Sequence, residues 1–216
     1  MVVLIAALLT FIQPPALEVR FIGNMAVSIT DGTVTVVTDF PYESGYSGYM
    51  TYAPSAIRSS TATTLALITH RHRDHWQAPL FTATNWRVAG PPDVTAGLPP
   101  DRVLPLARRT SFGPVTIDRF ETPHANVGHY SYVVTWHGRR LYFSGDTESV
   151  DSLAAARNLD AAFVSSWLYR AALRRGVRID AKQIVIYHHH AGERVAECAD
   201  RCTVPVQGAT IPLTRP

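Results

Sequence analysis

The sequence predicts a mixed α/β domain that begins with β-hairpins. Residues 17–40 are rich in β-branched and alternating apolar residues, and two turn-forming pairs, Gly23-Asn24 and Asp31-Gly32, interrupt them. Further along, short apolar runs have the length of strands, and residues 150–176 carry apolar side chains at helical spacing before Gly176. Strands and a helical stretch that follow one another in this way indicate the α/β class.

Four of the later runs share one layout: each has the length of a strand and is followed directly by a side chain that can bind a metal. Because sites in α/β folds gather at the carboxyl ends of strands, we expect these side chains to meet at one edge. The runs are "TTLALIT" (63–69) before His70, "VTIDRFET" (115–122) before Pro123 and His124, "RLYFSG" (140–145) before Asp146, and "QIVIY" (183–187) before His188, His189 and His190.

The size and charge of the chain limit its organisation and its partners. With 216 residues, of which 46% are hydrophobic, the chain is long enough for one sizeable core and short for two, so we expect one domain over residues 17–216. The formal net charge of +3 is modest and argues only weakly for a nucleic acid or membrane partner, so we do not expect nucleic acid binding. We expect a small-molecule substrate, and the sequence does not indicate an oligomeric state.

The first 16 residues form a separate apolar segment. The run from Val2 to Ile12 is too short to span a bilayer as a helix but has the length of a signal-peptide core, although neither Lys nor Arg precedes it. We interpret residues 1–16 as a leader or tether, with a strand or helix packed on the domain as the alternative. This favours export to the periplasm over a cytoplasmic location. Cys198 and Cys202 lack the second pair of a zinc ribbon and are either ordinary or paired thiols.

The stretch "LITHRHRDHW", residues 67–76, concentrates the candidate metal ligands. His70 and His72 are one residue apart, so in an extended segment both rings project to the same side and can share one cation. Asp74 and His75 follow where the chain would turn, which moves them toward a second position. Imidazole and a sparingly used carboxylate suit zinc. One short stretch therefore predicts ligands for two metals.

The order of these motifs resembles the metallo-β-lactamase superfamily. "HRHRDH" matches the H-x-H-x-D-H signature of that family, and the other elements follow in the same order along residues 17–216. Asp39 resembles the early structural aspartate, and the remaining matches are His124 in "TPHA", Asp146 in "FSGDT" and His189 in "IVIYHHH". The compact length and the phrase "RRLYFSGDT" are most similar to the branch that contains L-ascorbate-6-phosphate lactonase.

The resemblance implies a four-layer αββα sandwich, with two mixed β-sheets, helices on the outer faces and a dizinc site at the edge where the sheets meet. It also implies a division of ligands. The first zinc would be held by His70, His72 and His124, the second by Asp74, His75 and His189, with Asp146 bridging the two. The oxygen-reducing di-iron relatives typically carry a glutamate at the position of His72, so this histidine favours a hydrolytic dizinc site. Mn²⁺ or Fe²⁺ remain alternatives.

The chain departs from the family pattern near its last histidine motif. The proline that commonly stands two residues before the final ligand is replaced by Tyr187, so the choice among three consecutive histidines depends on register. If the strand continues to His188, alternation places His188 and His190 on the face opposite to His189. We therefore assign His189 as the ligand and leave the roles of its neighbours, and that of His129, open.

The predicted activity is hydrolysis of a small ester, lactone or phosphoester by metal-bound hydroxide, with Asp74 orienting the nucleophile or passing its proton to the leaving group. Two other functions are weighed against it: a phosphodiesterase or nuclease of the same fold, and a non-catalytic metal-binding protein. The loop of residues 41–55 contains four tyrosines and either forms a wall of the pocket or packs at the domain edge. Arginines around residues 170–178 either meet an anionic substrate group or form a solvated face.

Overall fold

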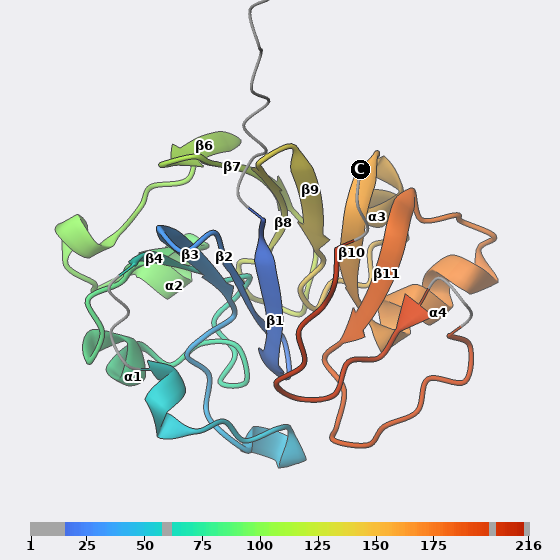
Figure 1. The fold of residues 1–216 in the computed structure, drawn as a ribbon, viewed down its shortest axis with the longest axis horizontal. Helices are drawn as coiled ribbons and strands as arrows, with labels where there is room; N and C mark the ends of the chain where they lie inside the picture. Colours follow the sequence, from blue (N-terminus) through green and yellow to red (C-terminus); the bar gives the residue numbers. More distant parts are fainter. Residues whose placement is uncertain (1–15, 58–61, 199–201, 214–216) are drawn as a thin grey trace, which may run out of the picture.

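The computed structural model describes residues 16–57, 62–198 and 202–213, and its two β-sheets pack against each other (Figure 1). The smaller sheet has the strand order β1-β2-β3-β4-β5, and the larger sheet has the order β12-β11-β10-β9-β8-β7-β6. All but one residue of the expected N-terminal leader, residues 1–16, lie outside the described ranges. No helix in those ranges is long and apolar enough to cross a membrane.

The smaller sheet is built from residues 18–89. Its first three strands are antiparallel and are joined by the two turns that the sequence predicts, whereas β3, β4 and β5 are parallel. The strands are β1 (Glu18–Gly23), β2 (Ala26–Thr30), β3 (Val34–Thr38), β4 (Thr63–Leu67) and β5 (Arg87–Ala89). The parallel register brings the carboxyl ends of β3 and β4 together, and these ends carry Asp39 and the loop from His70 to His75.

The larger sheet is also mixed. Strands β6 to β9 are antiparallel, and β9 to β12 are parallel. The strands are β6 (Arg109–Phe112), β7 (Val115–Glu121), β8 (Tyr130–Trp136), β9 (Arg139–Phe143), β10 (Leu159–Ser165), β11 (Ala181–Tyr187) and β12 (Cys202–Thr203). The four strand ends that the sequence singles out therefore belong to β4, β7, β9 and β11.

Short helices flank both sheets and complete the αββα sandwich (Figure 1). The helices α1 (Ala78–Thr82) and α2 (Pro92–Thr95) lie on the side of the smaller sheet, and α3 (Val150–Ala155) and α4 (Ser166–Arg174) lie on the side of the larger one. Three 3₁₀ turns are η1 (Tyr46–Gly48), η2 (Pro54–Ile57) and η3 (Pro100–Arg102). The predicted fold class is confirmed.

The main core lies between the sheets and follows the alternation of the strands. Phe21 and Val36 face inward from the smaller sheet, and Ile117, Phe143 and Val185 meet them from the larger one. Two further clusters fill the outer layers, one around Phe40, Trp76 and Trp86 and the other beneath α3 and α4. Because each sheet buries side chains on both faces, the edge where the strands end is held rigidly.

The helical stretch predicted for residues 150–176 is wrong in its middle. The helix α3 ends at Ala155, and "LDAAFVS" forms β10, a strand between β9 and β11 in which every residue is buried. A strand buried on both faces shows no alternation, so its small apolar residues can equally be read as a helix. Asn158, with φ 54°, marks the break in the chain direction before this strand.

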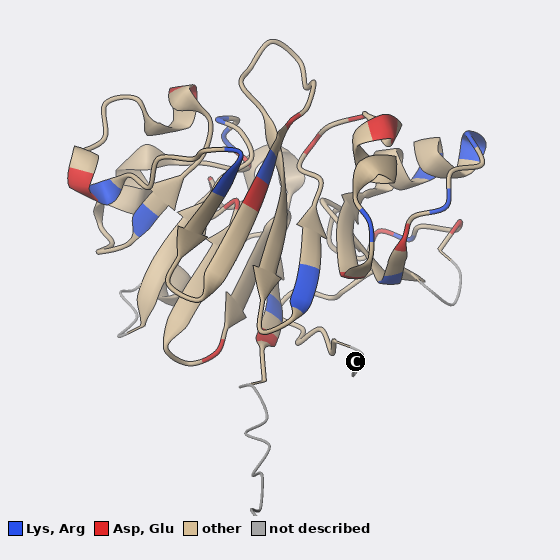
Figure 2. Cartoon of the chain, turned by 90° about the horizontal axis from the view of Figure 1, so that it is seen from above, with Lys and Arg blue, Asp and Glu red and all other residues tan. Residues whose placement is uncertain are grey.

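Charged side chains are dispersed over the part of the chain that the structure describes. Segments with Lys or Arg and segments with Asp or Glu are interspersed on both sheets and on the loops (Figure 2). Arg109 pairs with Asp118 on adjacent strands, and Asp160 accepts hydrogen bonds from Arg139 and Lys182. Oppositely charged residues therefore form ion pairs across neighbouring strands.

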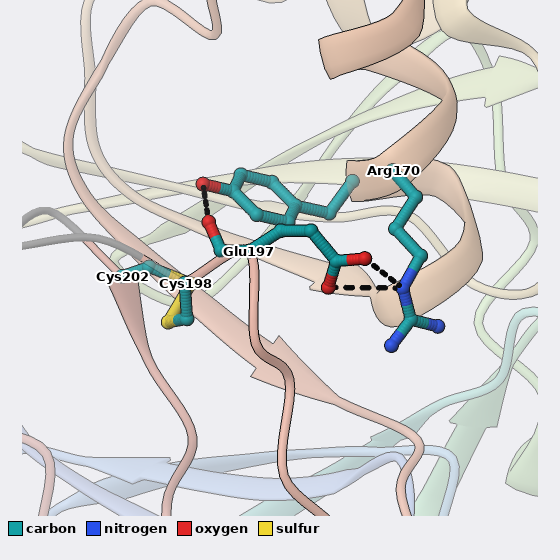
Figure 3. Close-up of a disulfide and its surroundings, with 5 residues drawn as sticks. Arg170, Glu197, Cys198 and Cys202 are labelled. Carbon is teal, nitrogen blue, oxygen red and sulfur yellow. Dashed lines mark hydrogen bonds and ion pairs between the residues drawn. A yellow bond between two sulfur atoms is a disulfide. The ribbon is translucent and has the colours of Figure 1, made fainter.

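Cys198 and Cys202 are joined by a disulfide beside α4 (Figure 3). The same segment is tied to the helix by Glu197, whose carboxylate oxygens accept from Nε of Arg170 at 3.1 and 3.2 Å. The backbone carbonyl of Glu197 accepts from the hydroxyl of Tyr169 at 3.3 Å. The two cysteines therefore have a structural role on the outer face of the larger sheet.

Candidate metal centre

Seven described side chains that could hold a metal ion meet in two groups at the edge where the sheets converge. Within each group, all the ligand atoms lie within 4.8 Å of one another. The first group contains His70, His72 and His124, and the second contains Asp74, His75, Asp146 and His188. Six of the seven predicted site residues are thus brought together, and His189 is not among them.

The first group joins the loop after β4 to the loop after β7. Nε2 of His70 lies 2.9 Å from Nδ1 of His72, and Nε2 of His124 lies 3.4 Å from the same nitrogen. His70 is fully buried, whereas His72 and His124 are partly exposed. Three imidazole nitrogens therefore converge at one point that is open on one side.

The second group adds two carboxylates to two imidazoles. Nε2 of His75 lies 3.6 Å from Oδ2 of Asp74 and 3.3 Å from Oδ2 of Asp146. Nε2 of His188 lies 3.3 Å from Oδ2 of Asp74 and 3.4 Å from Oδ1 of Asp146. All four side chains are buried.

Asp146 stands between the two groups. Its Oδ2 lies 3.9 Å from Nε2 of His70 and 3.8 Å from Nε2 of His124, besides its contact with His75. No other described residue approaches both groups through one carboxylate oxygen. The geometry is that expected of a side chain shared by two cations.

The distances and the unsatisfied atoms fit divalent cations. Two ligands about 2.1 Å from a tetrahedral ion lie about 3.4 Å from each other, close to the separations within both groups. Nε2 of His75, both ring nitrogens of His188 and Oδ1 of Asp146 are buried without a hydrogen-bond partner. Buried polar atoms are rarely left unpaired, and His75, His188 and Asp146 belong to the same group, so Nε2 of both histidines and Oδ1 of Asp146 fit a bound cation.

The structure brings His188, and not the sequence-based choice His189, into the second group. The strand β11 ends at Tyr187, and His188 adopts a left-handed conformation with φ 53°. Its backbone N–H donates to the carbonyl of Asn24 at 2.8 Å rather than continuing the sheet. The alternation assumed for a continuing strand therefore fails at this residue, and His188 takes the position assigned to its neighbour.

The other two histidines of the triplet face elsewhere. The ring of His189 is buried and stacks on Phe21, with ring centroids 5.6 Å apart. The ring of His190 is exposed and lies flat against Tyr49, at 4.4 Å between centroids and 1° between planes. One of three consecutive imidazoles is thus a candidate ligand, one packs in the core and one supports the loop above the centre.

Residues behind the ligands fix their orientation. Nδ1 of His75 lies 3.4 Å from Oδ2 of Asp39, and the hydroxyl of Thr69 lies 3.1 Å from Nδ1 of His70. The other oxygen of Asp39 accepts from the backbone N–H of Thr69 at 2.7 Å. These contacts occupy the Nδ1 side of both rings and leave each Nε2 toward the centre, the usual arrangement behind metal-binding histidines.

Asn24 connects the two loops of the second group and was read from the sequence only as a turn residue. Its side-chain amide donates to the backbone carbonyl of Asp74 at 2.7 Å, and its own carbonyl accepts from His188. Asn24 is fully buried with φ 53°, a conformation that asparagine tolerates better than most residues. The Gly-Asn pair predicted only a turn between β1 and β2, and nothing in the sequence indicated that Asn24 would connect these two loops.

The pKa shifts divide the imidazoles into two kinds. Burial lowers the pKa of His70 and His124, and the other imidazoles lower it further. Burial also lowers the pKa of His75 and His188, but Asp146 and a second carboxylate raise it by more, so the net shift is upward. His70 and His124 are therefore ready to offer lone pairs, whereas His75 and His188 hold protons that a cation would displace.

The carboxylates show the matching shifts. Burial raises the pKa of Asp146 and Asp74, but the facing His75 and His188 lower it by more. Both side chains are therefore held ionised. A pair of carboxylates kept charged in a buried site is the counterpart that two divalent cations need.

A comparison with known protein families identifies the family of the chain. Residues 48–206 match the sequence model described as the β-lactamase superfamily domain. The chain belongs to the metallo-β-lactamase superfamily. No curated protein sequence matches it.

Solved structures share the metallo-β-lactamase fold with this chain. The metallo-β-lactamase fold protein YhfI from Bacillus subtilis is 16% identical, with a TM-score of 0.65 and coverage of 90% of this chain and 98% of YhfI. Igni18, a metallo hydrolase from Ignicoccus hospitalis, is 14% identical, with a TM-score of 0.64 and coverage of 90% and 97%. CmlA, a diiron β-hydroxylase from Streptomyces venezuelae, is 16% identical at a TM-score of 0.51, covering 81% of this chain and 45% of CmlA. These matches do not single out the L-ascorbate-6-phosphate lactonase branch, which stays a prediction.

Two aromatic rings lie beside the second ligand group of this superfamily member. The rings of Tyr49 and Trp167 both meet the ring of His188 edge to face, with centroids 4.5 and 4.9 Å away. Burial, together with the charges of Asp74 and Asp146, raises the pKa of Tyr49 to about 12, so its hydroxyl keeps its proton. Of the other tyrosines in this loop, Tyr42 and Tyr52 pack against Phe40 in the outer core.

Proposed function

We propose that this chain is a hydrolase domain, extending over residues 17–216, that holds two divalent cations and cleaves a small neutral ester or lactone. The observation that carries this proposal is the carboxylate of Asp146, whose Oδ2 faces both groups of ligand atoms. In that arrangement His70, His72 and His124 would hold one cation, and Asp74, His75 and His188 the other. Imidazole-rich groups without thiolates suit zinc, so zinc is the first candidate, with manganese and iron as the others.

A pair of bound divalent cations would lower the pKa of a bound water and polarise the carbonyl oxygen of the ester or lactone. The chain would contribute the rest. Asp74, held ionised in the second group, would accept a hydrogen bond from the attacking water, take up the proton that the water loses and pass it to the leaving oxygen. Asp146 and the buried imidazoles would keep the ligand atoms in place without rearrangement during the reaction.

The surroundings of the centre favour a neutral substrate over a phosphoester. In the described part of the chain, no ion pair joins a lysine or arginine to either ligand group; instead, the nearby arginines are paired with carboxylates. Arg71 pairs with Asp93 at 3.1 Å and Arg73 with Glu43 at 2.5 Å. Recognition of a phosphate group usually uses a free guanidinium, so these pairs leave the phosphoester as the second candidate.

The proposed substrate class is tested by comparing esters, lactones and phosphodiesters as substrates. An ester and a phosphodiester that release the same chromophore, and a lactone whose ring opening is followed by the acid it forms, are to be compared by kcat/KM, with and without removal of cations by a chelator. We expect the ester or lactone to be turned over faster than the phosphodiester, and chelation to abolish turnover. Faster turnover of the phosphodiester would overturn the substrate assignment, and turnover unaffected by chelation would overturn the metal-dependent mechanism.

Trp167 offers a second test of the same site. Because its ring flanks His188, Trp167→Ala should raise KM for esters with an aromatic acyl group and leave KM for acetate esters nearly unchanged. Leu173→Ala, on the exposed side of the same helix, is the matched control. Equal effects on both classes of ester would show that Trp167 does not contact the substrate.

The disulfide supports a location outside the cytoplasm. Bonds between cysteines persist in oxidising compartments and are rare where glutathione keeps thiols reduced. The Cys198–Cys202 bond therefore agrees with the export suggested by the apolar start of the sequence. Alkylation of protein taken directly from its cells tests this: blocked thiols support export, and two freely alkylated thiols contradict it.

A further inference from the structure

We propose that His129 is a positioning residue of the metal centre: as a neutral imidazole with its proton on Nδ1, it fixes the backbone of Asp146. The inference rests on the proposed function only in taking Asp146 as the shared ligand. His129 is not itself among the ligand atoms of either group. It directly precedes β8, and in the sequence it is a lone histidine five residues after His124.

The first step of the argument is the contact between His129 and Asp146. The backbone N–H of Asp146 donates to Nε2 of His129 at 3.0 Å. A backbone amide can only donate, so Nε2 must carry a lone pair and not a proton. The ring must then be protonated on Nδ1 if it is to be neutral.

The second step is the partner of Nδ1. This nitrogen lies 2.7 Å from the hydroxyl oxygen of Thr122, which therefore accepts from it. The hydroxyl of Thr122 in turn lies 3.1 Å from that of Ser131, and Ser131 donates to the backbone carbonyl of Ser144 at 2.6 Å. A carbonyl can only accept, so the direction of every hydrogen bond from Asp146 to Ser144 is determined.

This relay begins and ends on one short segment. It starts at the N–H of Asp146 and returns to the carbonyl of Ser144, two residues earlier, through side chains that are all nearly inaccessible to solvent. Because water does not reach these groups, the opposite tautomer would set the ring N–H against the N–H of Asp146 and leave Thr122 without its donor. Such buried mismatches cost free energy, so one tautomer is selected.

Gly145 shows how closely the ring is fitted to the segment. A Cβ atom at this position would lie 2.4 Å from Nε2 of His129 and 2.9 Å from Cβ of Thr69. The N–H of Gly145 also donates to the hydroxyl of Tyr187 at 2.9 Å. The backbone on the amino side of Asp146 is thus held by a ring on one side and a phenol on the other, which orients its carboxylate toward the two ligand groups.

The test combines a spectroscopic measurement with a matched pair of variants. Nitrogen NMR of metal-free protein with ¹⁵N-labelled histidine distinguishes the two tautomers of His129 directly. The zinc dissociation constants are then measured by competition with a chelator for the wild type, for Thr122→Val, which removes the acceptor of Nδ1, and for Thr122→Ser, which keeps it. Outer hydrogen-bond partners of metal ligands typically contribute about 10- to 100-fold to metal affinity.

We expect a neutral Nδ1–H tautomer, zinc binding weakened by about 10- to 100-fold in Thr122→Val, and restored affinity in Thr122→Ser. A proton on Nε2 of His129, or unchanged zinc affinity in Thr122→Val, would overturn the inference. No substrate is used, so these results do not depend on the reaction. A wild-type chain that binds no zinc would instead overturn the proposed function, and the tautomer would still be decided by NMR.

Discussion

Nδ1 of His75 lies 3.4 Å from Oδ2 of Asp39, and both side chains are inaccessible to solvent. The same carboxylate accepts hydrogen bonds from the backbone and the hydroxyl of Thr69 at 2.7 and 3.0 Å, so it cannot turn away. A carboxylate behind an imidazole fixes the tautomer and increases the basicity of the ligand nitrogen. Asp39 therefore supports the second ligand group without belonging to it.

Asp39→Asn should weaken zinc binding by about 10- to 100-fold, because the amide keeps the volume but loses the charge behind His75. Asp31→Asn is the matched control: Asp31 pairs with His137 at 2.9 Å in the β2–β3 turn, at the other end of the strand from Asp39. Competition with a chelator measures both variants. Equal zinc affinity in the two variants would show that Asp39 does not act on the metal centre.

His188→Gln and His189→Gln should differ in the number of zinc ions that they retain. Loss of His188 removes one of four ligand side chains from the second group, so this variant should hold one tightly bound zinc per chain. Loss of His189 removes only a ring stacked on Phe21, so two zinc ions should remain. Metal analysis after dialysis gives the count, and the reverse pattern would restore the assignment made from the sequence.

Gly145→Ala should lower both the stability and the zinc affinity of the chain. Gly145 has φ 59°, and a Cβ atom would meet His129 at 2.4 Å. Gly113→Ala is the matched control, with φ 55° and its nearest contact at 3.7 Å. The control should lose about 1–2 kcal/mol from the left-handed conformation alone. Thermal unfolding of metal-free protein measures the difference, and equal losses would argue against the close contact with His129.

Zinc affinity should continue to rise above pH 6.5, the ordinary pKa of histidine. The facing carboxylates raise the pKa of His75 and His188 in the cation-free chain against the effect of burial. Their protonated forms stabilise that chain below pH 6.5, and this contribution is lost as the pH rises through the raised values. Below these raised pKa values, zinc must displace the protons of His75 and His188 in order to bind. Dissociation constants measured from about pH 6 to about pH 8 test this, and an affinity that levels off at pH 6.5 would contradict it.

The sequence is sufficient to predict most of the residues that the structure brings together as candidate ligands, because each follows a strand whose apolar run is easily recognised. His70, His124 and Asp146 are examples: β4, β7 and β9 end within a few residues of them, and the parallel and antiparallel neighbours bring these ends to one edge. The resemblance to the superfamily adds the pairing of ligands into two groups. Both kinds of prediction depend on local sequence patterns, which can be recognised without knowledge of the tertiary structure.

The errors arise where tertiary contacts override local patterns. His188 leaves the strand alternation because its N–H finds the carbonyl of Asn24, a residue 164 positions earlier in the chain. The strand β10 is buried on both faces and so lost its periodicity. The sequence does not distinguish His129 from a surface histidine, because its partners Thr122 and Asp146 contact it only once the sheet has formed.

The central claim is that two cations bound at this edge perform hydrolysis. The most direct measurement is the number of divalent cations per chain in the purified protein, taken together with ester and lactone turnover before chelation, after chelation and after return of zinc. Two ligand groups predict close to two cations per chain, with turnover lost on chelation and recovered with zinc. A chain without bound cations, or turnover that chelation leaves unchanged, would contradict this account.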